Sequence, residues 1–347
     1  MNTHPDRPCR PCSPANGAGF RSRLARVLPA LLALAVALPL TGCARNAATG
    51  ERRLMMLSLS EEIALGEEAA PQFTAEFGGA TPSPALQQYL TGIGERMAAR
   101  TEGDFPNIDW EFTLLDSAVV NAFALPGGKV FITRGLAERL EDESELAGVI
   151  GHEIGHVTAR HANSRISKQT LFSGGLQTIA AVLASAPADS GASTVGQATL
   201  PALQIGGELL MLRYGRGEEL EADDLGMRYM SRVGYDPSGQ LRVMQLRAEL
   251  SGGSGPTFDW FASHPDPAFR AERIADILAD EYATTSFDGD GRFATRFRNQ
   301  FLIPASRLPA PRHPTASGSA LSEREAAILA GALGGGCGGC GMVHSSE

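Results

Sequence analysis

Cysteine is scarce in this chain, and its distribution excludes a disulfide framework. Five cysteines occur in 347 residues. Cys9 and Cys12 precede an apolar N-terminal run and are expected to be removed with it, and Cys43 follows that run directly. Only Cys337 and Cys340 remain, as a CxxC pair in a glycine-rich tail. One such pair indicates neither redox catalysis nor a zinc site, so we expect an unstructured tail with at most a local crosslink.

The sequence also lacks an excess of positive charge and any long apolar run. Its net charge is −9, and residues 1–42, with five arginines and one aspartate, contribute +4, which leaves −13 for the rest of the chain. An acidic body of this kind disfavours nucleic acid as a partner. The most apolar stretch, residues 27–40, is too short to span a bilayer comfortably. No internal repeat is present.

The N-terminus has the features of a bacterial lipoprotein signal. Arginines precede the apolar run, which ends in LTGC, residues 40–43. This ending resembles a lipobox, in which the cysteine receives lipid and becomes the first residue of the mature protein. We predict a signal peptide over 1–42, lipidation of Cys43 and a polar tether over 43–53. An unmodified cysteine after an ordinary signal peptide is the alternative. Ala44 favours an outer-membrane location facing the periplasm.

Periodic patterns predict a mainly helical body with a few strands. Ser58 and Glu61 have the spacing of a capping box, and Asp142 and Glu145 repeat it before a histidine-rich segment. Alternating apolar residues over 108–114 predict a half-buried strand. The turn sequence PGG separates two further strand-like runs that we expect to form a hairpin. The other predicted helices cover 83–100, 216–232, a stretch after 237, and 263–282.

Residues 170–212 are rich in alanine, glycine and leucine, a composition that occurs in membrane proteins. Polar residues such as Gln177, Asp189 and Glu208 interrupt the apolar pieces. We therefore expect helices packed on the body, or a segment near a site, because an integral membrane protein would require residues 169–187 to insert. From 284 to 347 the composition predicts a loop-like C-terminal extension.

Three histidines lie within GVIGHEIGHVTARH, residues 148–161, and Glu153 is next to the first. On a helix, His152 and His156 lie on one face a single turn apart, close enough to bind one metal ion. In such an HExxH arrangement the two histidines bind zinc and the glutamate accepts a proton from the activated water. His161 lies well off that face and is expected to be structural or on the surface.

The usual third histidine downstream is missing, but acidic candidates occur in YGRGEELEADDLG, residues 214–226. Glu219 and Asp223 are four residues apart on a predicted helix. One carboxylate there could bind the metal, while the other accepts a hydrogen bond from a ring N–H of a liganding histidine. A solvated acidic helix face would show the same pattern.

Together these stretches resemble the zinc metallopeptidase family that includes the heat-shock protease HtpX, the CAAX prenyl endopeptidase and the periplasmic protease BepA. The third ligand of that family lies in an ExxAD motif, which Glu219, Ala222 and Asp223 match. Two further stretches agree, NAFALPGGKVFITRGL and SHPDPAFRAERI, so that the resemblance covers about residues 51–280.

The resemblance implies one Zn²⁺ ion per chain, bound by His152, His156 and Glu219, with Asp223 supporting a liganding histidine. It also implies an α+β, predominantly helical zincin-like metallopeptidase domain. A small sheet or hairpin would lie beside the active-site helix. We assign this domain to residues 54–283.

Two further features have more than one interpretation. The strand with Asn121, Ala122 and Phe123 would pair with an extended substrate through its backbone, or form an ordinary buried hairpin. His264 would be a fourth metal ligand that keeps the enzyme inactive, donate a hydrogen bond to the tetrahedral intermediate, or cap the next helix. Weaker candidates for an active-site role are Tyr214 and Arg216.

The sequence therefore predicts a lipid-anchored zinc metalloendopeptidase with Glu153 as general base. Unfolded or misassembled envelope proteins are its expected substrates, in a quality-control role. The alternative is a zinc-binding, chaperone-like envelope lipoprotein with little or no proteolytic activity. A structural zinc site normally has four protein ligands and does not need a glutamate between the histidines, which favours the enzyme.

Overall fold

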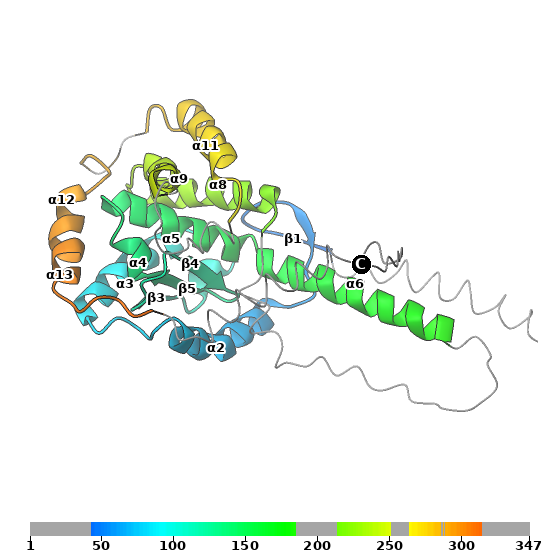
Figure 1. Ribbon diagram of the computed structural model, residues 1–347. Coiled ribbons are helices and arrows are strands. Elements are labelled where there is room, and N and C mark those ends of the chain that lie inside the picture. The colour runs from blue at the N-terminus through cyan, green and yellow to red at the C-terminus, as the bar shows by residue number, and fades with distance from the viewer. Residues whose placement is uncertain (1–42, 185–213, 251–263, 286, 288, 314–347) are drawn as a thin grey trace, which may run out of the picture.

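The computed structural model describes residues 43–184, 214–250, 264–285, 287 and 289–313. Within these residues a small sheet lies between one helix, α2, and a pair of helices, α3 and α5 (Figure 1). Helices α8, α9 and α11 form a further layer beyond α5. This is the predominantly helical α+β architecture that the sequence predicts. The helices named here are α2 (Leu59–Glu76), α3 (Pro84–Ala98), α5 (Glu143–Thr158), α8 (Arg216–Arg232), α9 (Ser238–Leu250) and α11 (Pro267–Glu281).

The sheet has three strands in the order β3 (Glu111–Leu115), β5 (Lys129–Thr133) and β4 (Ala122–Leu125). Strand β4 runs antiparallel to β5, which confirms the predicted hairpin, whereas β3 runs parallel to β5. The turn needs glycine at Gly127 and Gly128, whose φ angles are +76° and +90°. Strand β4 is an edge strand of this sheet, and it packs against α5.

Both faces of the sheet are covered. Phe112 and Leu114 belong to the core cluster shared with α3 and α5, whereas Phe123 and Phe131 pack with Phe73 of α2. The predicted strand is present as β3, but the expectation that it is half-buried is wrong, because every residue of β3 after Glu111 is buried. A strand with helices on both sides buries both sets of alternating side chains.

The two predicted capping boxes, at Ser58 and at Asp142, lie at the starts of α2 and α5, but only the first is complete. Ser58 and Glu61 form both hydrogen bonds of a capping box at the start of α2. The Asp142 side chain accepts a hydrogen bond from the Glu145 N–H at the start of α5. The Glu145 carboxylate, however, accepts from the N–H of Glu141 rather than from that of Asp142, so the reciprocal bond is absent.

Helix α5 is buried along its whole length, and glycines allow α8 to lie directly against it. A Cβ atom at Gly155 would lie 2.7 Å from the Ala222 carbonyl oxygen, and one at Gly151 would lie 3.1 Å from the Cα of Gly226. Both distances are shorter than normal van der Waals contact, so only glycine permits this approach. The HExxH segment and the ExxAD segment are therefore held backbone to backbone.

Two expectations for the ends of the domain are corrected. Residues 43–53, predicted as a tether, pair as the antiparallel strands β1 (Cys43–Arg45) and β2 (Arg52–Leu54). The loop-like prediction after 284 fails at 294–305, where Phe297 and Phe301 sit one turn apart and enter the main core. The short helices there are α12 (Ala294–Phe297), the π-helix η3 (Arg298–Leu302) and α13 (Ile303–Ala305).

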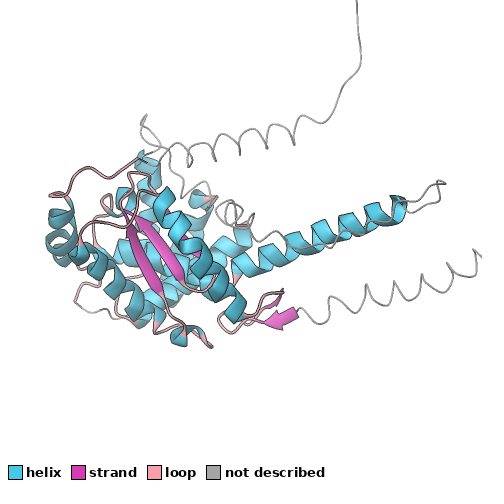
Figure 2. Cartoon of the chain, turned by 90° about the horizontal axis from the view of Figure 1, so that it is seen from below, coloured by secondary structure: helices cyan, strands magenta, loops and turns pink. Residues whose placement is uncertain are grey.

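Helix α6 (His161–Ala184) begins beside the end of α5 and extends away from the body (Figures 1 and 2). No helix in the described residues combines the length and the apolar character needed to cross a membrane. The predicted signal peptide, the CxxC tail and residues 185–213 lie outside the described residues. The short helices not yet named are η1 (Phe105–Asn107) and α4 (Arg134–Ala137).

Replacing Gly155 with alanine tests the close contact of α5 and α8. We expect Gly155→Ala to lower the free energy of unfolding by about 1–3 kcal/mol, because the new methyl group overpacks against Ala222. Gly92→Ala on α3 is the matched control, since a Cβ atom there meets nothing within 4 Å. The free energy of unfolding of Gly92→Ala should rise by about 0.5–1 kcal/mol, because alanine has a higher helix propensity than glycine. Urea denaturation of both proteins measures the difference, and equal stabilities would contradict the packing argument.

Candidate metal centre

Helix α5 brings His152, Glu153 and His156 into the centre of the protein. All three are buried. The rings of His152 and His156 lie edge to face with centroids 4.6 Å apart, and their Nε2 atoms are 3.0 Å apart. Helical spacing of four residues thus places both Nε2 atoms at one point, as the sequence predicts.

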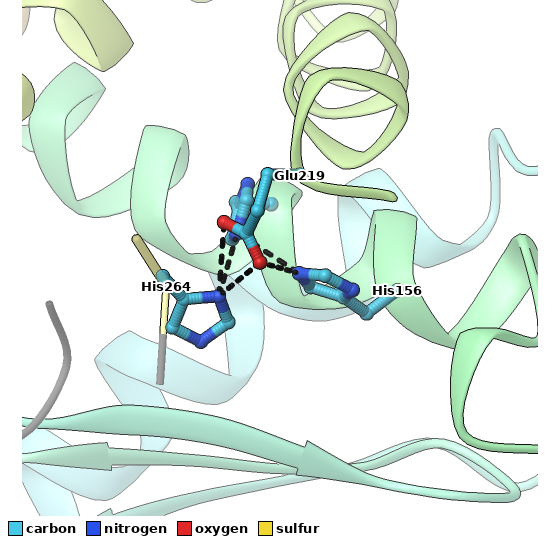
Figure 3. Close-up of side chains that lie close together, drawn as sticks. His156, Glu219 and His264 are labelled. Atoms are coloured by element: carbon cyan, nitrogen blue, oxygen red, sulfur yellow. Dashed lines mark hydrogen bonds and ion pairs between the residues drawn. The ribbon is translucent and has the colours of Figure 1, made fainter. Parts of the chain in front are cut away.

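Helix α8 supplies Glu219 to the same point. Its Oε2 lies 3.5 Å from His152 Nε2, and its Oε1 lies 3.5 Å from His156 Nε2. The side chain is completely buried. Figure 3 shows Glu219 reaching from α8 toward His156 and His264.

His264, just before α11, completes the group. Its Nδ1 lies 3.0 Å from Glu219 Oε1 and 3.2 Å from His152 Nε2. The suggestion that His264 caps the next helix is not supported, because α11 begins at Pro267 with Asp266 at its N-cap position. Asp266 itself makes no capping hydrogen bond there and pairs with Arg216 instead.

The four side chains have the donor set and spacing of a cation site. One ligand atom from each of His152, His156, Glu219 and His264 lies within 4.8 Å of the others. Ligands about 2.0–2.1 Å from a tetrahedrally coordinated zinc lie roughly 3.3 Å from one another. Separations of 3.0–3.5 Å between these nitrogens and oxygens agree with that geometry. The residues present therefore fit a bound metal ion.

The charges around the cluster also favour a cation. Burial and Arg270 would lower the pKa of His152, but Asp223 and Glu219 outweigh them and raise it to about 9. Burial would raise the pKa of Glu219, whereas His264 and His152 lower it well below its usual range, so the carboxylate is ionised. A pocket that stabilises positive charge on an imidazole offers the same field to a metal ion.

Asp223 supports His152 as the sequence predicts for a carboxylate one turn beyond Glu219. Its Oδ1 lies 2.9 Å from His152 Nδ1 and also accepts a hydrogen bond from Gln240. Burial would raise the pKa of Asp223, but Arg270 and His152 lower it. The carboxylate is thus ionised and holds the His152 ring in place.

Glu153 lies beside the cluster without entering the group of four. Its Oε1 is 3.5 Å from His264 Nε2. Only 1% of the residue is exposed. A carboxylate in this position can exchange a proton with a molecule bound next to the metal ligands.

Three more residues contact this cluster, of which Arg270 was missed from the sequence, His161 was expected to be structural or on the surface, and Tyr214 was named as a weaker candidate. Arg270 is fully buried and pairs with Asp223 at 2.7 Å and Glu219 at 2.8 Å. His161, expected to be structural or on the surface, is buried with its Nδ1 2.8 Å from His156 Nδ1. Tyr214 stacks on the His156 ring at a centroid distance of 3.9 Å. The sequence signal for Arg270 was its place in SHPDPAFRAERI, a stretch that also contains Arg273.

The predicted substrate strand lies next to this cluster. Asn121 directly precedes β4, and its backbone is bonded to Thr133 of β5. The side chains of Ala122 and Phe123 are buried, and Phe123 stacks on Phe131. Strand β4 has no second strand partner among the described residues.

The fold and the cluster define a helical protein with a zincin-like metal-binding site. A model of Peptidase family M48 matches residues 84–278, more than half of the chain. The chain therefore belongs to peptidase family M48. The matched range contains the HExxH helix, the ExxAD helix and His264.

Similar proteins include two named groups of peptidases. The beta-barrel assembly-enhancing protease of Yersinia pestis is 30% identical over 214 residues, which are 62% of this chain and 43% of that protein. The mitochondrial metalloendopeptidase OMA1 of Arabidopsis thaliana is 32% identical over 178 residues, 51% of this chain and 33% of that protein. The mitochondrial metalloendopeptidase OMA1 of Schizosaccharomyces pombe is 28% identical over 234 residues, which are 67% of this chain and 65% of that protein. The chain thus spans between a third and two thirds of the length of these curated relatives.

Arg270 should be essential for the stability of the metal centre. We expect Arg270→Met to lower the free energy of unfolding by about 3–5 kcal/mol, because it leaves the buried carboxylates of Asp223 and Glu219 without their cation. Arg216→Met is the matched control. Arg216 pairs with Asp266 at the surface, where its side chain is 61% exposed, so its loss should cost about 0–1 kcal/mol. Denaturant unfolding of the metal-free proteins compares them, and similar losses would contradict this assignment.

Proposed function

We propose that this protein is a zinc-dependent metalloendopeptidase. The observation that carries the proposal is the buried group of His152, His156, Glu219 and His264, whose ligand atoms lie within 4.8 Å of one another, with Glu153 at its edge. Membership of peptidase family M48 supports the same activity. Imidazole and carboxylate ligands of this kind suit zinc.

Each residue has a defined role in this proposal. His152, His156 and Glu219 hold Zn²⁺, which as a Lewis acid makes water acidic near neutral pH and polarises a peptide carbonyl. Glu153 accepts the proton of the attacking water and transfers it to the leaving amine. Asp223 and Arg270 keep the His152 ring and the Glu219 carboxylate in position through the contacts described above.

His264 holds the site closed at rest. A catalytic zinc site keeps one position for water or substrate, whereas here a fourth side chain occupies the ligand group. A cavity of about 10 Å³, roughly the space of one water molecule, lies between β4, His156 and Tyr214, and neither Glu219 nor His264 lines it. Cleavage therefore requires His264 to leave the cluster. In the closed arrangement His264 Nε2 lies 3.5 Å from Glu153 Oε1.

Strand β4 would hold the substrate. Its free edge offers backbone N–H and C=O groups to an extended peptide, which would align beside α5 as an added strand. Asn121, Ala122 and Phe123 contribute through this backbone, because the side chains of Ala122 and Phe123 are already buried in the core. A peptide bound this way must be unfolded over several residues, which favours unfolded or misassembled proteins as substrates.

A second candidate function follows from the closed cluster. Four protein ligands are typical of a structural zinc site, so a chaperone-like envelope lipoprotein with little or no proteolytic activity is the alternative. The two candidates differ in one respect that can be measured. Only the enzyme loses a function when Glu153 is replaced while zinc remains bound.

The proposed location is the cell envelope. Cys43 follows a signal-like segment, and the bacterial relative is named a beta-barrel assembly-enhancing protease. We place the protein on the outer membrane, facing the periplasm, attached through lipid on Cys43. An endopeptidase at this location would degrade faulty envelope proteins, so we propose quality control of envelope proteins as its role.

The decisive experiment compares casein cleavage by the wild type and Glu153→Gln after one bound zinc per chain has been confirmed in both. We expect Glu153→Gln to keep zinc and to cleave about 10²–10⁴-fold more slowly, because it lacks the general base. His264→Ala is the third protein in the comparison. It should cleave faster than the wild type if His264 closes the site.

Zinc binding without cleavage in both the wild type and His264→Ala would support the chaperone-like alternative and end the endopeptidase proposal. Unchanged cleavage by Glu153→Gln would remove Glu153 as general base. A loss of cleavage in His264→Ala with zinc retained would instead assign His264 to stabilising the tetrahedral intermediate.

The lipid anchor has a separate test. Cells expressing the wild type or Cys43→Ser are labelled with a fatty-acid analogue, and the purified proteins are compared. We expect the label on the wild type and none on Cys43→Ser, because the thiol is the acceptor. Equal labelling of both proteins would show that Cys43 is not the lipidated residue.

A further inference from the structure

The hairpin formed by β1 and β2 is attached to the active-site helix. The Asn46 side chain donates a buried hydrogen bond of 2.8 Å to the carbonyl of Thr158, the last residue of α5. The side-chain oxygen Oδ1 of Asn46 accepts hydrogen bonds from the backbone N–H groups of Ala48 and Thr49, which shapes the turn of the hairpin. This segment therefore belongs to the folded body that surrounds the metal centre.

A continuous chain of polar contacts leads from this hairpin to the metal centre. His156 Nδ1 lies 2.8 Å from His161 Nδ1, and His161 Nε2 lies 2.8 Å from Glu221 Oε2. Arg53 of β2 donates a hydrogen bond to the same Glu221 oxygen. The side chains are shielded from water, with exposed fractions of 0% for His161, 17% for Glu221 and 13% for Arg53.

The protons along this chain can be assigned without conflict. His156 faces the ligand cluster with Nε2, so its Nδ1 carries the proton and donates to His161 Nδ1. His161 is then protonated on Nε2 and donates to the Glu221 carboxylate. Burial would raise the pKa of Glu221, but the hydrogen bond from His161 and the charge of Arg53 lower it. Each donor thus has an acceptor. The direction of every hydrogen bond follows from the orientation of His156, whose Nε2 faces the ligand cluster.

The two liganding histidines are thus supported in the same way by different parts of the chain. His152 donates to Asp223, a carboxylate held by Arg270 of α11. His156 contacts its carboxylate, Glu221, indirectly, because the His161 ring lies between them. Arg53 pairs with Glu221 as Arg270 pairs with Asp223. An outer partner of this kind fixes the orientation and tautomer of a metal-binding imidazole.

We propose that His161, Glu221 and Arg53 are positioning residues for His156, and that the N-terminal hairpin is a structural part of the metal centre. This inference rests on the proposed zinc site. It also means that the segment beginning at Cys43, the proposed attachment point of the lipid, contributes to metal binding.

The test measures zinc affinity in the full-length protein by competition with a fluorescent chelator. Glu221→Gln and Arg53→Gln are the test variants, because both residues lie at the edge of the body and their replacement leaves the apolar core intact. Asp224→Asn is the control for Glu221, since it lines the same cleft from the same helix. Arg52→Gln, the exposed neighbour on β2, is the control for Arg53.

We expect Glu221→Gln to bind zinc about 10–100-fold more weakly, the usual effect of losing a partner of a liganding histidine. Arg53→Gln should show a smaller loss in the same direction, and both controls should match the wild type. The visible absorption bands of bound Co²⁺ provide a second measurement. They should shift in the two test variants, because they report on ligand geometry, and remain unchanged in the controls.

Equal zinc affinities and identical Co²⁺ spectra in the wild type and Glu221→Gln would overturn the inference and leave the proposed function intact. Losses of the same size in the controls would also overturn it, since they would indicate a general effect of charge. A wild-type protein that binds no zinc would overturn the proposed function itself. Thermal unfolding of the metal-free variants separates a loss of affinity from a loss of the fold.

Discussion

The metal centre depends on one packing contact, the close approach of α8 to α5. Gly151 and Gly155 occupy the side of α5 where a Cβ atom would collide with the backbone of α8. This approach lets the short carboxylate side chains of Glu219 and Asp223 reach His152 and His156. A side chain at either glycine would move the carboxylates away from the histidines, so the glycines of the HExxH helix are as much part of the site as its ligands.

The second constraint is electrostatic. Glu219 and Asp223 are ionised although buried, and an isolated buried carboxylate would be very costly. Arg270 contacts both, and His152 contacts Asp223. The negative charges of these carboxylates are thus balanced by the positive charges of Arg270 and of the proposed zinc ion. The same principle explains why Glu221 is placed beside Arg53 at the end of the His161 contact.

The ligand group and the unpaired edge of β4 both border α5. His264 lies within the ligand group, and Tyr214 stacks on His156, while the free edge of β4 borders the same helix. His264 comes from the turn before α11 rather than from a helix. A ligand on a turn can leave the cluster without breaking a helix, whereas those on α5 and α8 cannot. This difference separates the three permanent ligands of our proposal from the fourth.

Local patterns in the sequence determined the elements and most of the proposed ligands. The capping box at Ser58 and the facing pair His152 and His156 depend only on residues three or four positions apart, and the resemblance to a known family selected Glu219. The tertiary structure alone decided the rest. It buried both faces of β3, turned the expected tether into a hairpin and brought Arg53, His161 and Arg270 to the ligands. The contacts of Arg53 with Glu221 and of Arg270 with Asp223 join segments far apart in the chain, so no local spacing could reveal them.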